Sequence, residues 1–417
     1  MSGALTVLPN GVRVWTEPMP ALASAAIGVW VRAGAMDERR EENGVAHLLE
    51  HMAFKGASRR DARAIAEDVE AVGGYLNAAT SYPHTGYYAR VLKDDAPLAF
   101  DILADIVRAP TLAARDLDTE KDVVIQEIGE ARDTPDDLLF ENLQAATFEG
   151  QALGRPILGE AGQVATYMPD DLRAFVARHY RPAHVVVAAA GAVDPAEILD
   201  LAARYFGDMA DAADAEASDR SFRIVGGVRH VPRDLEQTHV AFSAPGAGLT
   251  APDYVAARVF TEILGGGMAS RLFQNIREKR GLAYSVYAFA DAYDAVGASG
   301  FYLGVEPGRG AEALRLSLDE IAAIARDVLP AEVDRARAMF RASLLMGLEN
   351  PMGRAERAAG DLFTHGRVRD PAAIEASLAE VTPEAVSAFA ERLLQAPGRA
   401  LSVVGPADFA TMRSVIS

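Results

Sequence analysis

Residues 169–191 read PDDLRAFVARHYRPAHVVVAAAG, and residues 383–405 read PEAVSAFAERLLQAPGRALSVVG. The two segments align without gaps at an offset of 214 residues. Each predicts an amphipathic helix that is opened by proline and followed by an apolar strand ending in glycine. Because similarity at a fixed offset indicates a repeated structural unit, we predict two homologous domains of about 200 residues each.

An acidic segment at residues 207–221, GDMADAADAEASDRS, separates the two copies and predicts a solvated linker. The domains are then residues 1–206 and residues 222–417. Each half alternates helical and strand patterns, and we predict an α+β (mixed α/β) fold in which each domain is a mostly antiparallel sheet packed with helices. In the first half, the helical patterns span 61–72, 96–108, 116–132 and 169–179, and the strand patterns span 25–32, 86–92 and 185–190.

Composition excludes several classes of protein. The chain of 417 residues has 59 acidic and 41 basic side chains, a formal net charge of −18, which argues against nucleic acid as a partner. No apolar stretch approaches the 18 or more residues of a membrane span, and the N-terminus lacks a signal or transit pattern, so we expect a cytoplasmic protein without membrane contact. The absence of cysteine excludes disulfides, thiol catalysis and cysteine-ligated metal sites.

Residues 47–51 read HLLEH, within a helix-sized run that we expect to begin at Asn43 as N-cap and to stop at Gly56. Helical spacing places His47, Glu50 and His51 on one face. Two imidazoles one turn apart can bind one Zn²⁺, and the carboxylate between them can take a proton from the attacking water. This order of residues is the inverted zincin motif, HxxEH.

A hydrolytic zinc site needs a third protein ligand. The predicted helix at 116–132 carries three glutamates that could supply it, namely Glu120, Glu127 and Glu130. The spacing alone leaves open which of them is a ligand, a supporting residue or part of the solvated surface.

The sequence resembles the pitrilysin/insulinase metallopeptidases (inverzincins), most closely the catalytic subunit of mitochondrial processing peptidase and its bacterial relatives. The resemblance implies that His47, His51 and Glu127 bind zinc, one ion per chain, that Glu50 is the general base, and that Glu120 helps to orient the site. The matching segments extend over both halves, and they are HLLEHMAFKG (47–56), GGYLNAATS (73–81), VVIQEIGEARDTPDD (123–137), YRPAHVVVAAAG (180–191) and LGGGMASRLFQNIREKRGLAYSVYAF (264–289).

Elements that contact substrate are also implied. In the resembling family, the segment at 73–80 is an edge strand to which the peptide adds as a further strand, and this implies substrate contacts at Asn77, Ala78 and Ala79. The resemblance assigns Arg277 and Tyr284 to holding the substrate carbonyl, and both side chains can donate to a developing oxyanion.

The repeat also distinguishes the two halves. At an offset of 212, the positions of His47, Glu50 and His51 are held by Val259, Glu262 and Ile263, so we expect no metal site in the second half.

Together these observations predict a zinc endopeptidase that cleaves short or unfolded peptides in an enclosed chamber, with a preference for basic peptides. One chain carries both the zinc residues and the Arg277/Tyr284 pair, so we expect a homodimer in which the pair acts in trans. The alternatives are a non-catalytic structural subunit, like the core proteins of respiratory complexes, and the zinc-bearing half of a heterodimer.

Overall fold

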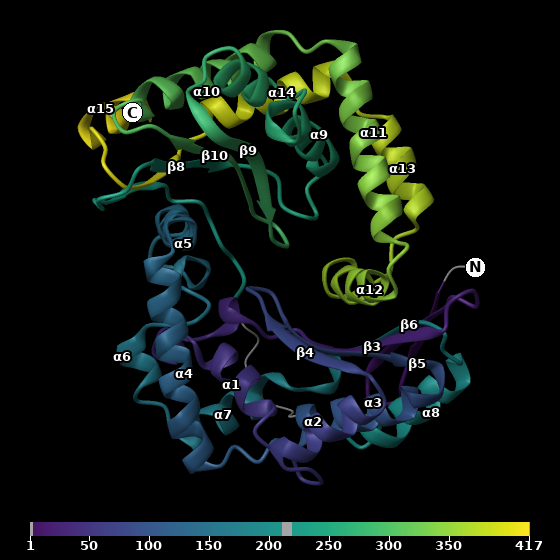
Figure 1. The fold of residues 1–417 in the computed structure, drawn as a ribbon. Coiled ribbons are helices and arrows are strands. Elements are labelled where there is room, and N and C mark those ends of the chain that lie inside the picture. The colour runs from purple at the N-terminus through teal and green to yellow at the C-terminus, as the bar shows by residue number, and fades with distance from the viewer. Residues whose placement is uncertain (1–2, 211–218, 417) are drawn as a thin grey trace. The chain divides into compact units, whose positions relative to one another are not determined.

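The computed structural model describes residues 3–210 and 219–416, which form two compact units (Figure 1). One unit comprises Met1–Ile128, Pro156–Arg220 and Met346–Asp370, and the other comprises Gly129–Arg155, Ser221–Leu345 and Pro371–Ser417. Each half of the chain therefore contributes one segment to the other half's unit. The domain boundaries at residues 206 and 222 are drawn from the sequence repeat, and they stay a prediction.

The first unit is built on a six-stranded sheet in the order β1-β2-β6-β3-β5-β4, in which only β2 and β6 run parallel. Its strands are β1 (Ala4–Val7), β2 (Arg13–Pro18), β3 (Ser24–Val31), β4 (Tyr75–Thr80), β5 (Thr85–Leu92) and β6 (Val185–Gly191). Its helices are α1 (Val45–Ala53), α2 (Ala62–Ala71), α3 (Ala96–Arg108), α4 (Ala114–Asp133), α6 (Ala161–Val164), α7 (Pro169–His179), α8 (Pro195–Phe206) and α12 (Pro351–His365).

The second unit is built on a five-stranded sheet in the order β7-β11-β8-β10-β9, in which only β7 and β11 run parallel. Its strands are β7 (Gly227–Val231), β8 (Thr238–Pro245), β9 (Ala283–Ala292), β10 (Gly297–Val305) and β11 (Ala400–Val404). Its helices are α5 (Pro135–Thr147), α9 (Tyr254–Gly265), α10 (Gly310–Arg326), α11 (Pro330–Gly347), α13 (Pro371–Ala379), α14 (Pro383–Gln395) and α15 (Phe409–Ile416), with a π-helical turn η6 (Phe273–Glu278).

The two sheets have the same strand order once the N-terminal strand β1 is set aside. The repeated segments 169–191 and 383–405 form α7 with β6 and α14 with β11, respectively. The predicted fold class, two homologous domains with mostly antiparallel sheets packed by helices, is confirmed. No helix among the described residues is long and apolar enough to cross a membrane.

In each unit, one helix packs on the sheet face that is not covered by the main helical layer. In the first unit this is α12, which presents Ala355, Ala358, Ala359 and Leu362 to Trp15, Trp30 and the small residues of β6. In the second unit it is α5, whose Leu139 and Leu143 pack on β8 and β11. Because both faces of each sheet are buried, a central strand can be apolar throughout, as VVVAAAG of β6 is.

Both ends of the predicted linker bind the first unit. Asp208 forms an ion pair with Arg108 at 2.6 Å, and Arg220 forms one with the buried Asp37 at 2.7 Å. The central residues 211–218 of the predicted linker lie outside the described residues.

Candidate functional site

The HLLEH segment lies on α1, whose start differs from the sequence expectation. The expected N-cap Asn43 is wrong, because the cap position is held by Gly44 with φ of 90°. A side chain at Gly44 would collide with the backbone of Leu158 and Gly159. The first N–H groups of a helix have no partner inside the helix. Here the carboxylate of Glu38 accepts from the N–H groups of Gly44 at 3.0 Å and Ala46 at 2.9 Å.

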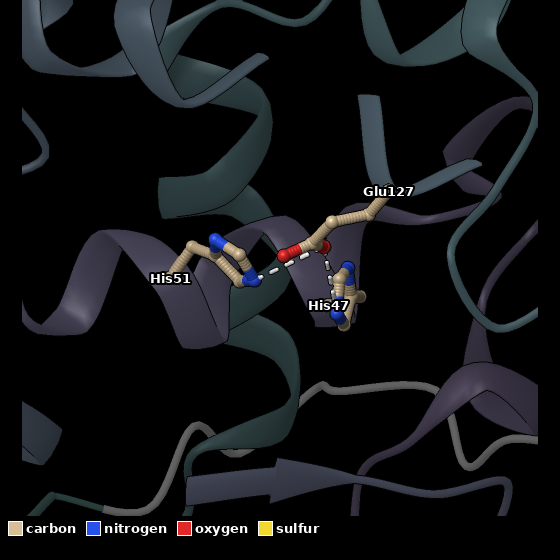
Figure 2. Close-up of side chains that lie close together, drawn as sticks. All are labelled: His47, His51 and Glu127. Atoms are coloured by element: carbon tan, nitrogen blue, oxygen red, sulfur yellow. Dashed lines mark ion pairs between the residues drawn. The ribbon is translucent and has the colours of Figure 1, made fainter. Parts of the chain in front are cut away.

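Three side chains converge beside this helix. His47 and His51 lie one turn apart on α1, and Glu127 reaches them from α4 (Figure 2). Glu127 Oε2 lies 3.8 Å from His47 Nε2 and 3.5 Å from His51 Nε2. One ligand atom from each side chain lies within 4.8 Å of the others. Of the three glutamates that the spacing left open, Glu127 is the one in this group.

The group has the donor chemistry that zinc requires. Donor atoms bound to one tetrahedral zinc at about 2.0–2.2 Å lie roughly 3.3–3.6 Å apart, close to the 3.5 and 3.8 Å between Glu127 and the two histidines. Burial, with the neighbouring His51 as a smaller cause, lowers the pKa of His47 to about 4. His47 is therefore neutral at pH 7, as a metal-binding imidazole must be.

Glu120 contacts the ring nitrogen of His51 that does not face Glu127. This residue is buried, with 3% of its surface exposed, and its Oε2 lies 3.1 Å from His51 Nδ1. The contact holds the ring with Nε2 directed toward Glu127, an arrangement typical of metal-binding histidines. The other carboxylate oxygen of Glu120 binds Lys55 Nζ at 2.6 Å.

Glu50 lies on α1 between the two histidines. Burial raises the pKa of its carboxyl, although hydrogen bonds from the hydroxyl and the backbone N–H of Thr80 oppose part of this rise. Within the described residues, the buried Oε2 of Glu50 has no hydrogen-bond partner. A buried carboxylate oxygen that is free beside the ligand group can accept a proton from water.

Sequence reasoning missed Lys55 and Thr80. Lys55 follows His51 by four residues, within the segment HLLEHMAFKG (47–56). A lysine just after a helix is usually solvated. Thr80 ends the predicted edge strand, and nothing in its spacing links it to Glu50. Both contacts depend on how α1 packs against other elements.

The expected edge strand is β4, which pairs with β5 and is the last strand of its sheet. Asn77 and Ala79 are exposed, whereas Ala78 is buried with 7% of its surface exposed and faces the core. Asn77 Nδ2 donates to the hydroxyl of Tyr75 at 2.8 Å. Thr80, at the end of the same strand, ties β4 to Glu50.

In the second unit, the structure brings together Arg277 of η6 and Tyr284 of β9. The Arg277 guanidinium lies 5.1 Å from the centre of the Tyr284 ring and 4.8 Å from that of Phe273. Tyr284 is 72% exposed, so its hydroxyl is accessible to a ligand.

The positions that correspond to the motif in the second half lie on α9. Val259 and Ile263 replace the two histidines and are buried in the core of the second unit. Glu262 lies at the position that corresponds to Glu50, and burial raises the pKa of Glu262.

Comparison with known proteins gives matches over most of the chain. Residues 13–161 match the family profile described as insulinase, peptidase family M16, and residues 167–340 match the profile described as peptidase M16 inactive domain.

Related sequences cover nearly the full length. An uncharacterized zinc protease of Mycobacterium tuberculosis is 40% identical over 406 residues, which cover 96% of this chain and 92% of that protein. An uncharacterized zinc protease of Bacillus subtilis is 34% identical, with coverage of 95% and 97%. Among solved structures, a protease from Helicobacter pylori has a TM-score of 0.89 at 19% identity, covering 97% of this chain and 99% of that one. At that identity the likeness concerns the fold.

Proposed function

This chain belongs to the insulinase family of peptidases (family M16) and is a zinc metallopeptidase, and we propose that it is an endopeptidase acting on short or unfolded peptides. The observation that carries the proposal is the convergence of His47, His51 and Glu127 beside Glu50. In this proposal the three converging side chains hold one zinc ion per chain. Zinc held by these residues would supply a lowered pKa for water and polarisation of the scissile carbonyl.

The chain's own residues perform the proton transfers. Glu50 takes a proton from the attacking water and returns it to the leaving amine. Its raised pKa makes the Glu50 carboxylate a stronger base, which favours taking a proton from water. Glu120 keeps His51 oriented, and Thr80 holds Glu50 at the end of β4.

The peptide binds as an added strand on β4. The outer edge of β4 offers backbone groups, and the exposed Asn77 and the small Ala79 leave room for an approaching chain. Strand addition requires an extended substrate, which is why short or unfolded peptides are proposed. Arg277 and Tyr284 are proposed to contact the substrate carbonyl.

The residues of one chain also bear on how the chains assemble. Because the chain carries both the zinc residues and the Arg277/Tyr284 pair, we infer a homodimer in which each pair serves the partner's site and the two chains enclose a chamber. The net charge of −18 supports a preference for basic peptides. The cytoplasmic location stays a prediction of the sequence.

Metal analysis combined with peptide cleavage tests the function. The purified protein should contain zinc and should cleave an unfolded peptide mixture, basic peptides faster than acidic ones, in a reaction stopped by a chelator. The Glu50→Gln variant should keep its zinc and lose at least about a hundredfold in kcat/KM, since it lacks the general base. A matched control is Glu130→Gln, an exposed glutamate of α4, which should behave as wild type. Substantial turnover by the Glu50→Gln variant would contradict the assignment.

A non-catalytic role is disfavoured by the same group of residues. A purely structural subunit has no need for the two histidines, the glutamate and the buried carboxylate to meet at one place. If wild-type protein bound no zinc and cleaved no peptide, the structural alternative would replace this proposal.

A further inference from the structure

Lys55 lies two residues beyond the end of α1 and turns back toward α4. Its ammonium nitrogen lies 2.6 Å from Glu120 Oε1, and this contact links the helix of the two histidines to the helix of Glu127. We propose that Lys55 is a positioning residue of the metal site, acting through Glu120. The inference rests on the proposed function, because it assigns Lys55 a role in holding the same zinc ligands.

The two oxygens of Glu120 have different partners. Oε2 contacts His51 Nδ1 at 3.1 Å, and Oε1 contacts Lys55 Nζ. The side chain of Glu120 is 4% exposed, so a charged carboxylate at this place needs close partners. Lys55 supplies a full positive charge from a side chain that is 38% exposed. The ammonium group thus fixes one end of the carboxylate, and the other end is left to hold the His51 ring.

The contact also fixes α4 against α1. Glu120 and Glu127 are two turns apart on α4, a rise of about 10 Å along the helix. Binding of Glu120 by Lys55 holds one point of α4 beside the end of α1, and Glu127 then meets both histidines further along. Without Lys55, the Glu120 carboxylate can rotate, and the orientation of His51 and the placement of Glu127 both become less defined.

An ordinary surface ion pair would contribute little. Exposed pairs stabilise proteins by about 0–1 kcal/mol and rarely affect a distant function. Lys55 differs because its partner is buried and directly contacts a proposed zinc ligand. The role is therefore visible in metal affinity and in the state of the His51 ring more than in global stability.

Zinc affinity of the metal-free proteins tests the proposal. We expect Lys55→Met to bind zinc about tenfold more weakly than wild type in competition with a chromophoric chelator, because loss of outer partners of a ligand typically costs 10–100-fold. Lys55→Arg should restore most of the affinity. Lys93→Met, a change at an exposed lysine of the same unit, should have no effect. If Lys55→Met does not fold, as judged by circular dichroism, Lys55→Gln takes its place.

Two further measurements separate positioning from a general structural effect. Nitrogen-15 correlation spectra of the metal-free protein should show the His51 ring protonated on Nδ1 in wild type and mixed between its two nitrogens in Lys55→Met. In addition, the double variant Lys55→Met/Glu120→Gln should bind zinc no more weakly than Glu120→Gln alone, because residues that act through one another are not additive.

The outcomes distinguish this inference from the proposed function. Wild-type affinity in Lys55→Met, or losses that add in the double variant, would overturn the role of Lys55 while leaving the zinc site intact. Absence of zinc binding by wild type would overturn the proposed function, and the role of Lys55 with it.

Discussion

At the scale of single residues, the site combines groups whose environments differ strongly over a short distance. Burial raises the pKa of Glu50 and lowers that of His47 to about 4, because in both residues burial disfavours the charged form. Glu120, which contacts His51, keeps two charged or polar partners instead. One carboxyl is thereby free for proton transfer, and the other is committed to holding a ring in place.

The raised pKa of Glu50 has a consequence for stability. A carboxyl whose pKa is higher in the folded state favours folding below its ordinary pKa of 4.5, and this contribution is lost as pH rises through the folded value. Metal-free Glu50→Gln should therefore be more stable than metal-free wild type at pH 7. The advantage should shrink as pH falls toward 4.5. Urea unfolding at several pH values measures this, and an advantage that grows on acidification would contradict it.

Much of this site could be predicted from residue spacing. The HLLEH order placed His47, Glu50 and His51 on one face, and the structure has them so on α1. The choice among the three glutamates needed the family resemblance, since helical spacing alone does not say which turn of α4 meets α1. Lys55 and Thr80 could not be predicted because their roles arise from packing between elements far apart in the sequence.

At the scale of elements, β4 is a sheet edge next to the site. In an antiparallel pair, hydrogen-bonded and non-hydrogen-bonded residues alternate along the strand. A substrate peptide on β4 should thus use every second amide. Methylation of those amides should lower kcat/KM several-fold to about tenfold per position, the value of one net hydrogen bond. Methylation of the intervening amides is the control and should be tolerated. An equal response at all positions would exclude strand addition.

Sequence patterns predict that helices and strands form, but they do not predict which sheet a helix such as α12 covers. The alternating patterns predicted the main helices and strands of the first half, and the repeat predicted a second sheet like the first. That α12 would cover the first sheet, and α5 the second, was not predicted. Both helices have amphipathic patterns that would fit either sheet, so the partner is decided by long-range packing.

The packing of α12 can be tested at Leu362, which is 1% exposed and lies against the first sheet. Leu362→Ala should lower the free energy of unfolding by about 2–5 kcal/mol, since it removes buried methyl groups and leaves a cavity. The matched helical control is Leu345→Ala on α11, where the side chain is 37% exposed and the change should lie within about 0.5 kcal/mol. Denaturant midpoints compare the two. Equal effects would mean that α12 does not contribute to the core as described.

At the scale of the whole molecule, the two units have the same topology and different chemistry. The first keeps the histidines and glutamates of the proposed zinc site, and the second has Val259 and Ile263 at the corresponding places and carries Arg277 beside the exposed Tyr284. In our proposal the first unit is catalytic and the second contacts substrate, and such a chain is suited to a two-fold dimer because each chain can then supply what the partner's site needs.

Complementation between variants tests this assembly. Glu50→Gln and Arg277→Ala should each be nearly inactive, with the second losing about 10²–10³ in kcat/KM if its guanidinium stabilises the oxyanion. After subunit exchange, a mixed dimer has one site with both residues intact when Arg277 acts in trans. Equal mixing then restores about a quarter of wild-type activity, because half of the dimers are mixed and each has one working site. If the Arg277→Ala chain in this mixture is replaced by the double variant Glu50→Gln/Arg277→Ala, the recovery should be abolished. If native mass spectrometry shows mixed dimers and activity does not return, Arg277 acts within its own chain. A monomeric particle would exclude the homodimer itself.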